Sequence, residues 1–147
     1  MKRVARSAIV EHAAAAVYDI VEDIESYPEF LPWCYAASVH ERQPERTVAT
    51  LTVGMRAIRQ SFTTENANRP GEEIVLRLLK GPFKKFGAAW RFTALGERAA
   101  KIEFSMEYEF ANRVLGKALE PLFDNIADTM VSAFSRRADQ LYGKTPD

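Results

Sequence analysis

The stretch VLGKALEPLFDNIADTMVSAFSRRADQL, residues 114–141, decides the fold of this 147-residue chain. Its apolar residues recur at steps of three and four, which places them on one face of a helix. These residues are Leu115, Leu119, Leu122, Ile126, Met130, Phe134, Ala138 and Leu141. Polar residues occupy the opposite face, so one side of the helix should meet a core while the other meets water.

Pro121 lies inside this pattern. An interior proline removes one backbone hydrogen bond and clashes with the preceding turn, at a cost of about 3 kcal/mol. We therefore expect a kink or a break there, with residues 114–120 forming a separately hinged piece. The helix over residues 121–141 should be roughly 30 Å long, because each residue adds about 1.5 Å.

Before the helix, apolar and polar residues alternate with the period of two that is typical of half-buried strands. The clearest strand covers residues 101–110 and spans roughly 33 Å, so its apolar face matches the helix in length. That face carries Ile102, Phe104, Met106, Tyr108 and Phe110. Further strands are predicted over residues 2–11, 36–41, 49–57, 59–66, 73–80 and 86–95. Short turns at residues 43–46, 66–71, 81–82 and 96–98 imply an antiparallel sheet.

Two short helical segments follow the first strand. Residues 13–22 are rich in alanine and have helical spacing, which favours a short helix. The carboxylates of Asp19, Glu22, Asp23 and Glu25 are interpreted as solvated surface, because nothing basic accompanies them in the sequence.

The second helical segment, YPEFLPWC at residues 27–34, contains two prolines that forbid a long helix. It also carries four large hydrophobic residues, Tyr27, Phe30, Leu31 and Trp33. This segment is either a hydrophobic plug that closes one end of the core or part of the wall of a ligand cavity, since aromatic residues dominate such walls.

The order of elements predicts an α+β fold in which a curved, seven-stranded antiparallel sheet wraps around the long helix. One domain should cover residues 1–143, followed by a short tail at 144–147. A single helix about 10 Å wide cannot fill the concave face of such a sheet. The remaining space is either packed solid by large side chains or left as a cavity.

The charges exclude a strong overall field, because 20 basic and 20 acidic residues give a net charge of zero. DNA is not an expected partner, and any affinity for a polyanion must come from a local patch. The one basic concentration, KGPFKKF at residues 80–86, is either a solvated loop or a contact for an anionic membrane or RNA. Its candidate contact residues are Lys80, Lys84, Lys85 and Phe86.

The sequence shows no sign of catalytic or metal chemistry. His12 and His40 have no ligand at a metal-binding spacing, and no phosphate loop or nucleophile elbow occurs. The single cysteine, Cys34, is interpreted as a buried structural thiol that cannot form an internal disulfide. No stretch approaches the roughly 20 apolar residues of a membrane span. We therefore expect a cytoplasmic protein that is not an enzyme.

Three sets of residues together resemble a known family. They are YPEFLPWC at 27–34, LKGPF at 79–83 with WRF at 90–92, and the helix residues Ala127-Asp128, Ala133-Phe134 and Arg136-Arg137-Ala138. The chain resembles the coenzyme Q-binding START-like proteins, part of the SRPBCC or polyketide cyclase/dehydrase-like group. The resemblance implies a helix-grip (START-like/Bet v 1-like) fold with a hydrophobic tunnel between sheet and helix. It also implies ubiquinone binding in support of respiration or, in one bacterial case, interference with the association of ribosomal subunits.

The first functional hypothesis is a non-enzymatic carrier of ubiquinone or a similar polyprenyl lipid, held in the tunnel. A bound tail would gain about 0.8 kcal/mol per methylene-sized group. The expected ligand contacts are Phe30, Leu31, Trp33, Val53, Phe62, Leu78, Phe83, Trp90, Phe104, Met106, Tyr108, Phe123 and Met130. Ser61, Tyr35 and Tyr108 are candidates for the head group, while Phe83 and Phe86 with their lysines would touch a peripheral membrane.

The second hypothesis is an interaction protein that binds the large ribosomal subunit through residues 80–85. The neutral net charge argues mildly against it, because RNA affinity depends on many cationic contacts. A weaker third hypothesis is a polyketide cyclase or aromatase, although no polar acid–base pair is apparent on the predicted inner faces.

Overall fold

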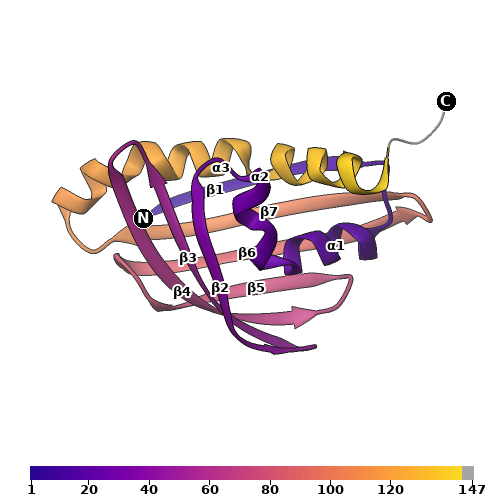
Figure 1. Cartoon of the computed structure of the whole chain (residues 1–147), viewed down its shortest axis with the longest axis horizontal. Coiled ribbons are helices and arrows are strands. Elements are labelled where there is room, and N and C mark those ends of the chain that lie inside the picture. Colours follow the sequence, from indigo (N-terminus) through magenta and orange to yellow (C-terminus); the bar gives the residue numbers. More distant parts are fainter. Residues whose placement is uncertain (144–147) are drawn as a thin grey trace.

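Seven strands form one curved antiparallel sheet in the computed structural model, which describes residues 1–143 (Figure 1). The spatial order of the strands is β1-β7-β6-β5-β4-β3-β2. The strands are β1 (Lys2–Val10), β2 (Cys34–Gln43), β3 (Arg46–Met55), β4 (Ile58–Arg69), β5 (Glu73–Lys80), β6 (Phe83–Gly96) and β7 (Ala99–Phe110). The predicted α+β architecture is confirmed, and the tail predicted at 144–147 lies outside the described residues.

The helices are α1 (Ala14–Glu22), α2 (Tyr27–Phe30) and α3 (Arg113–Tyr142), with a 3₁₀ turn (Ile24–Ser26) before α2. Figure 1 shows α3 running along one long side of the molecule, where it packs on β1 and β7. Two ion pairs fasten this contact. Lys2 Nζ lies 2.7 Å from Asp124 Oδ1, and Arg6 Nη2 lies 2.9 Å from Asp128 Oδ1.

Of the kink or break expected at Pro121, the break is wrong, because α3 continues through this residue as one 30-residue helix. Residues 114–120 are therefore part of α3 and not a separately hinged piece. A kink at this position stays a prediction. Pro121 is on the exposed side, while Leu119 and Leu122 beside it are each only 1% exposed. Their burial holds the helix together across the missing hydrogen bond. Leu141, predicted on the apolar face, is 52% exposed.

Several strand boundaries differ from the prediction, and three of these differences have a clear physical cause. β4 continues to Arg69, so the turn expected over 66–71 begins only after it, because the side chains of Asn66 and Asn68 are buried in the sheet. β3 ends at Met55, since Arg56 has a φ of 58° and turns the chain before Ala57. β6 begins already at Phe83, which pairs with Phe110 of β7.

The acidic surface of α1 has a partner that sequence reasoning missed. Arg42 of β2 lies 3.0 Å from Glu22 Oε1 and 2.7 Å from Glu25 Oε2. Glu22 is also only 19% exposed, so the interpretation of this carboxylate as fully solvated is wrong. The long reach across 17 to 20 residues of sequence explains why no local pattern shows the pairing.

Candidate functional site

A small apolar cavity lies between the inner faces of β3–β7 and α3. It is lined by Tyr27, Trp33, Leu51, Phe62, Leu76, Phe86, Ala88, Trp90, Phe104, Met106, Phe123, Ile126 and Met130. Its volume is about 60 Å³, whereas small-molecule sites usually have roughly 300–1,000 Å³. In this conformation the cavity has no room for a quinone ring with its tail.

Aromatic rings take up the space that a tunnel would need. The ring centroids of Trp90 and Phe134 are 5.1 Å apart, and those of Trp90 and Phe104 are 4.9 Å apart. At the other end, Phe123 of α3 packs edge-on against Phe83 at 5.3 Å. Such contacts are typical of a close-packed core. The alternative of a solidly packed interior therefore describes this structure better than an open tunnel does.

The predicted ligand contacts divide into two groups. Those that line the cavity are Trp33, Phe62, Trp90, Phe104, Met106, Phe123 and Met130. Those that pack outside it are Phe30, Leu31, Val53, Leu78, Phe83 and Tyr108. Sequence reasoning did not select Tyr27, Leu51, Leu76, Ala88 and Ile126, which also line it. The strand alternation pointed Leu51 and Leu76 inward, so the signal for these two was present.

The segment at residues 27–34 closes one end of the core as a hydrophobic plug, and two of its residues, Tyr27 and Trp33, also line the cavity. Leu31 is 1% exposed and Trp33 is 4% exposed, and the indole of Trp33 donates to Thr129 Oγ1 of α3 at 3.3 Å. The Tyr27 hydroxyl donates to the carbonyl of Val21, and burial raises the pKa of this tyrosine. Burial also raises the pKa of the Cys34 thiol to about 11, which fits a structural cysteine.

None of the proposed head-group residues offers a polar atom to the cavity. Ser61 is exposed and bonds to Thr52 Oγ1 at 2.8 Å, and Tyr35 is 45% exposed on the surface. Tyr108 is 2% exposed, but it does not line the cavity, and its hydroxyl has no hydrogen-bond partner within residues 1–143. None of these three residues lines the cavity, and their role as head-group ligands stays a prediction.

A buried polar cluster that sequence reasoning missed lies on the inner side of β3 and β4. Asn68 Nδ2 donates to Thr47 Oγ1 at 3.0 Å, and the Thr47 hydroxyl donates to Glu22 Oε1 at 2.9 Å. Next to it, the Thr64 hydroxyl donates to Asn66 Oδ1 at 2.7 Å. Thr64, Asn66 and Asn68 occupy the inward positions that continue from Phe62, so the alternation could have revealed them.

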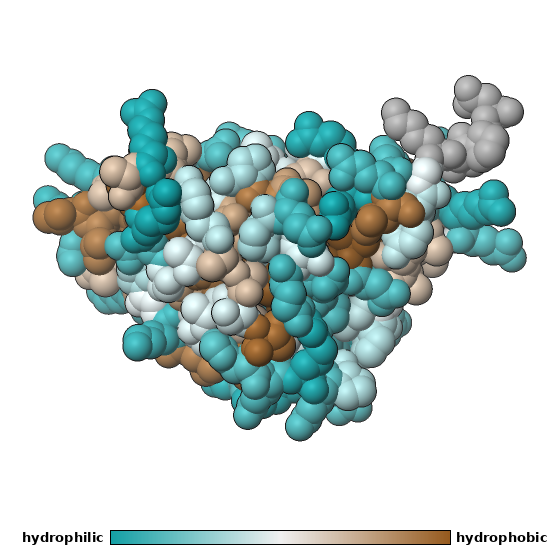
Figure 2. Space-filling view, viewed as in Figure 1, coloured by the Kyte–Doolittle hydropathy of each residue, from teal (hydrophilic) through white to brown (hydrophobic). Residues whose placement is uncertain are grey.

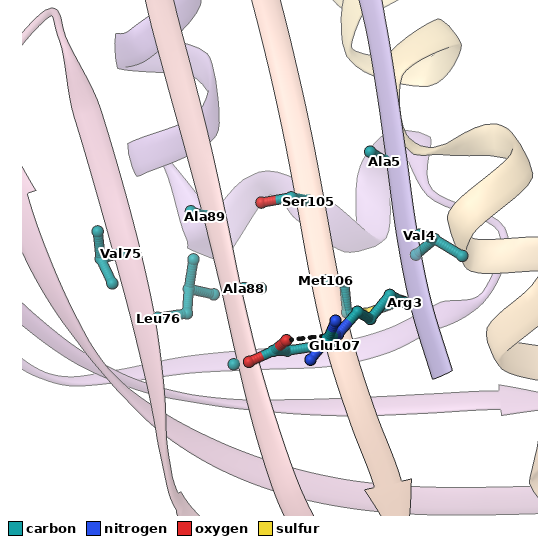
Figure 3. A pocket seen from close by; sticks show the side chains of 11 residues that line it. Arg3, Val4, Ala5, Val75, Leu76, Ala88, Ala89, Ser105, Met106 and Glu107 are labelled. Carbon is teal, nitrogen blue, oxygen red and sulfur yellow. Dashed lines mark ion pairs between the residues drawn. The ribbon is translucent and has the colours of Figure 1, made fainter. Parts of the chain in front are cut away.

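The outer face of the sheet carries a shallow groove instead of a closed pocket (Figure 3). Small side chains on neighbouring strands, Ala5, Ser105 and Ala89, face one another in register across it. Arg3 Nε and Glu107 Oε2, 3.2 Å apart, form an ion pair at one side, as Figure 3 shows. The groove is open to solvent and its charged neighbours are already paired, so nothing in it selects a ligand.

The predicted basic patch is only partly on the surface. Lys80, Lys84 and Lys85 are exposed, but Phe83 is 7% exposed and Phe86 is half-buried against the cavity. The expectation that Phe83 touches a membrane is therefore wrong, because its ring belongs to the core. In the part of the chain that the structure describes, no helix is long and apolar enough to cross a membrane.

The histidines have structural partners, and no cluster of metal ligands occurs within residues 1–143. His12 is 6% exposed, and its Nε2 lies 2.7 Å from Asp139 Oδ1 near the end of α3. His40 Nε2 lies 2.7 Å from Thr50 Oγ1 on the neighbouring strand. Both rings therefore fasten one element to another.

Comparison with known proteins gives the family. A family model described as polyketide cyclase / dehydrase and lipid transport matches residues 10–135. The chain belongs to this family. The resemblance inferred from the sequence motifs is thereby confirmed. Among solved structures, the ZhuI aromatase/cyclase from Streptomyces sp. R1128 superposes with a TM-score of 0.83 at 16% identity, covering 96% of this chain and 95% of that one. At this identity, the likeness within the polyketide cyclase and lipid transport family shows the fold alone.

Two curated relatives differ in how closely they match. The ribosome association toxin RatA of Pseudomonas aeruginosa is 44% identical over 138 residues, which are 94% of this chain and 96% of the relative. The mitochondrial coenzyme Q-binding protein COQ10 homolog B of Xenopus laevis is 27% identical over 142 residues. That match covers 94% of this chain but only 58% of the relative. Within the polyketide cyclase and lipid transport family, the chain is thus more similar to the ribosome-associated protein than to the quinone-binding one.

Proposed function

We propose that this protein binds the large ribosomal subunit and blocks its association with the small subunit, without catalysing a reaction. The observation that carries the proposal is the 44% identity to a protein named ribosome association toxin over almost the whole of both chains. The geometry agrees in two respects. The cavity of about 60 Å³ leaves little room for a large guest, and Lys80, Lys84 and Lys85 are exposed to a partner.

Sucrose-gradient profiles of cells that overproduce the protein test this function. We expect free subunits to accumulate at the expense of intact ribosomes, because a factor on the large subunit removes it from the joining equilibrium. A copy of the gene with a stop codon near its start is the control. An unchanged ratio of free subunits to intact ribosomes, at protein levels above the ribosome concentration, would contradict the proposal.

A second candidate is binding of ubiquinone or a similar polyprenyl lipid, which stays a prediction. It is supported by the likeness to the COQ10 homolog and by the wholly apolar and aromatic lining of the cavity. Binding would require α3 and the β3–β4 strands to separate, because the cavity is several-fold too small as it stands. Mass spectrometry of organic extracts from the purified protein tests it, and a stoichiometric quinone is the result expected of a carrier.

A further inference from the structure

Three segments that are far apart in the sequence form one end of the molecule, which we term the basic end. They are residues 55–59 at the β3–β4 turn, residues 79–86 around the β5–β6 turn, and residues 111–118 at the start of α3. Figure 1 shows all three at its left-hand end. They contain two, three and two basic residues respectively, and no Asp or Glu. The net charge of zero therefore hides a local excess of positive charge.

Direct contacts hold two of these segments together and join them to β4. The amide of Ala111 donates to the carbonyl of Pro82 at 3.0 Å, which places the start of α3 beside the β5–β6 turn. Lys80 pairs with Thr63 of β4, the strand that leads back to the β3–β4 turn. A Cβ on Gly81 would lie 2.7 Å from Phe62 Cβ, so the β5–β6 turn presses closely on β4. The basic end is thus part of the rigid fold and not a set of independent loops.

Most of the positive charge at the basic end is unneutralised. Lys84 lies 3.6 Å from Glu109, but no ion pair occurs within residues 1–143 for Arg56, Lys80, Lys85, Arg113 and Lys117. On the outer face of the sheet, by contrast, arginines such as Arg77 and Arg91 pair with the carboxylates of neighbouring strands. Free cations that converge on one surface attract a polyanion at low cost, because no internal ion pair must be broken.

An aromatic platform flanks the cations at the β3–β4 turn. The Arg59 guanidinium lies 3.5 Å from the ring centroid of Tyr35, which is 45% exposed. The same arginine donates to the carbonyl of Arg56 at 2.6 Å, so it is fixed in place. Gly54 makes room for the stack, since a Cβ there would lie 2.9 Å from the Tyr35 ring. Planar guanidinium and phenol groups on a surface are the groups on which unpaired bases of RNA stack.

The apolar residues at the basic end argue against a membrane as the partner. The large rings that could enter a bilayer, Phe83 and Phe86, point into the core. What remains exposed is aliphatic and not aromatic: Val114 at 79%, Leu79 at 49% and Ile58 at 37%. Figure 2 shows a brown area at the left-hand tip, bordered by teal side chains. A surface of this kind contacts phosphates more readily than it inserts into lipid.

From this combination we infer that the basic end is an RNA-binding surface, which contacts the phosphate backbone of large-subunit ribosomal RNA and stacks an unpaired base on Tyr35 and Arg59. The inference rests on the proposed function and names the part of the ribosome and the part of this chain that meet. Lys80 and Lys85 belong to the patch expected from the sequence, while Arg56, Arg113 and Lys117 join it only in the fold.

The test is co-sedimentation of purified protein with large ribosomal subunits and, separately, with their deproteinised RNA, at about 50, 100 and 200 mM salt. The triple variant Arg56→Glu, Lys85→Glu and Arg113→Glu reverses one exposed charge in each segment. We expect it to bind at least 30-fold more weakly at the lowest salt. Its slope of log affinity against log salt should fall by about 2 to 3, because three phosphate contacts are lost.

The matched control is Arg98→Glu, Lys101→Glu and Arg136→Glu, which changes the net charge equally. These residues are exposed and form no ion pair within residues 1–143. They lie in the β6–β7 turn, at the start of β7 and in the last turns of α3, and Figure 1 shows these parts of the chain at its right-hand end. Affinity of the control should stay within threefold of the wild type. Tyr35→Ala should weaken binding to unpaired RNA about tenfold and leave the salt slope unchanged, since stacking releases no counterions.

The results distinguish a failure of the inference from a failure of the proposed function. If the wild type sediments with subunits and the basic-end variant does so equally well, the inference is wrong and the proposed function stands. If the wild type does not bind subunits at all, both fail. Vesicles of phosphatidylglycerol and phosphatidylcholine form a third arm. If the wild type binds these vesicles and the basic-end variant does not, while both bind RNA equally well, the surface is a membrane contact and the inference is wrong.

Discussion

Two buried tyrosines show how the same side chain can have opposite energetic roles. Tyr27 is 8% exposed, and its hydroxyl donates to the Val21 carbonyl at the end of α1. Tyr108 is 2% exposed, and its hydroxyl has no partner within residues 1–143. A buried hydroxyl without a hydrogen bond loses its water without compensation, whereas a bonded one contributes about 1 kcal/mol.

The two Tyr→Phe variants should therefore differ in stability. Tyr27→Phe removes a made hydrogen bond and leaves a carbonyl unpaired, so we expect a loss of about 1–2 kcal/mol in the free energy of unfolding. Tyr108→Phe removes an unpaired hydroxyl and should be neutral or stabilising by up to about 1 kcal/mol. Urea unfolding followed by tryptophan fluorescence measures both. A Tyr108→Phe variant that is less stable than Tyr27→Phe would show that the Tyr108 hydroxyl has a partner.

At the scale of the elements, tertiary packing overrides local preference. Pro121 lacks the amide that an interior helix position needs, but α3 remains one helix because the residues on either side are buried. Arg42 likewise connects β2 to α1 and the 3₁₀ turn, which no local pattern connects. These contacts hold the short helices against the sheet and so keep the plug at residues 27–34 in place.

Replacing Pro121 by alanine tests whether the proline is only tolerated or is needed. An alanine restores one backbone hydrogen bond on an exposed side of α3, so we expect a gain of about 1–3 kcal/mol in unfolding free energy. Ala118→Pro, another exposed position of the same helix, is the matched control and should cost about 3 kcal/mol. Destabilisation by Pro121→Ala would mean that the packing of α3 on the sheet depends on the proline.

The Arg42 contact makes stability depend on pH. Hydrogen bonding to Arg42 lowers the pKa of Glu25 below its usual value of 4.5. The folded state then holds the ionised carboxylate more firmly than the unfolded state, so this stabilisation is present above pH 4.5. It is lost as the pH falls through the lowered pKa of the folded state. Because Glu25 and Arg42 are 48% and 40% exposed, the effect should not exceed about 1 kcal/mol.

The variant Arg42→Gln measures this effect. It should unfold more easily than the wild type at pH 7, and the difference should shrink between pH 4.5 and pH 3, as Glu25 becomes protonated in both proteins. Arg98→Gln, at a turn without an ion pair within residues 1–143, should show the same small difference at every pH. An Arg42→Gln effect that is equal at pH 7 and pH 3 would mean that the bond from Arg42 to the Glu22 carbonyl, 3.0 Å long, carries the whole contribution.

At the scale of the whole molecule, the interior and the surface offer separate functions. The interior cavity of about 60 Å³ is the only feature that connects the structure to a carrier of hydrophobic ligands, as far as residues 1–143 are concerned. The basic end is its counterpart on the surface. Because Phe86 is the one residue of the basic end that also lines the cavity, a substitution elsewhere in the lining can affect the first without the second.

The variant Ala88→Val tests whether the cavity and the basic end have separate functions. Ala88 lines the cavity, and two added methyl-sized groups should fill much of it and stabilise the fold by about 1 kcal/mol. Ribosome binding should be unchanged, whereas any lipid recovered in organic extracts should fall. Ala89→Val adds the same groups one residue further on, in the groove of the outer face, and serves as control. Equal lipid recovery from both variants would place a bound lipid outside the cavity.

Most of the fold follows from the spacing of apolar residues. The strand of residues 101–110 and the helix of residues 114–141 were readable because period 2 and period 3.6 each persist over many residues. The start of β6 and the end of β4 could not be predicted in this way. A turn signal at Gly81-Pro82 or at Asn66–Gly71 gives no information about which side chains the sheet will bury. The aromatic residues of the core were also found, but their spacing could not show how tightly they pack.

The sequence by itself determined the α+β architecture, the apolar inner face and the family, because these depend on periodicity and on local motifs. The tertiary structure alone decided whether the interior is a tunnel, since the volume left between rings depends on their rotamers and on how closely α3 approaches the sheet. It also decided which charges meet. Arg42 pairs with Glu22 and Glu25, while Arg56, Lys85 and Arg113 come to one end of the molecule and form no ion pair within residues 1–143. Strand order and turn direction fix these neighbours, which the linear chain does not.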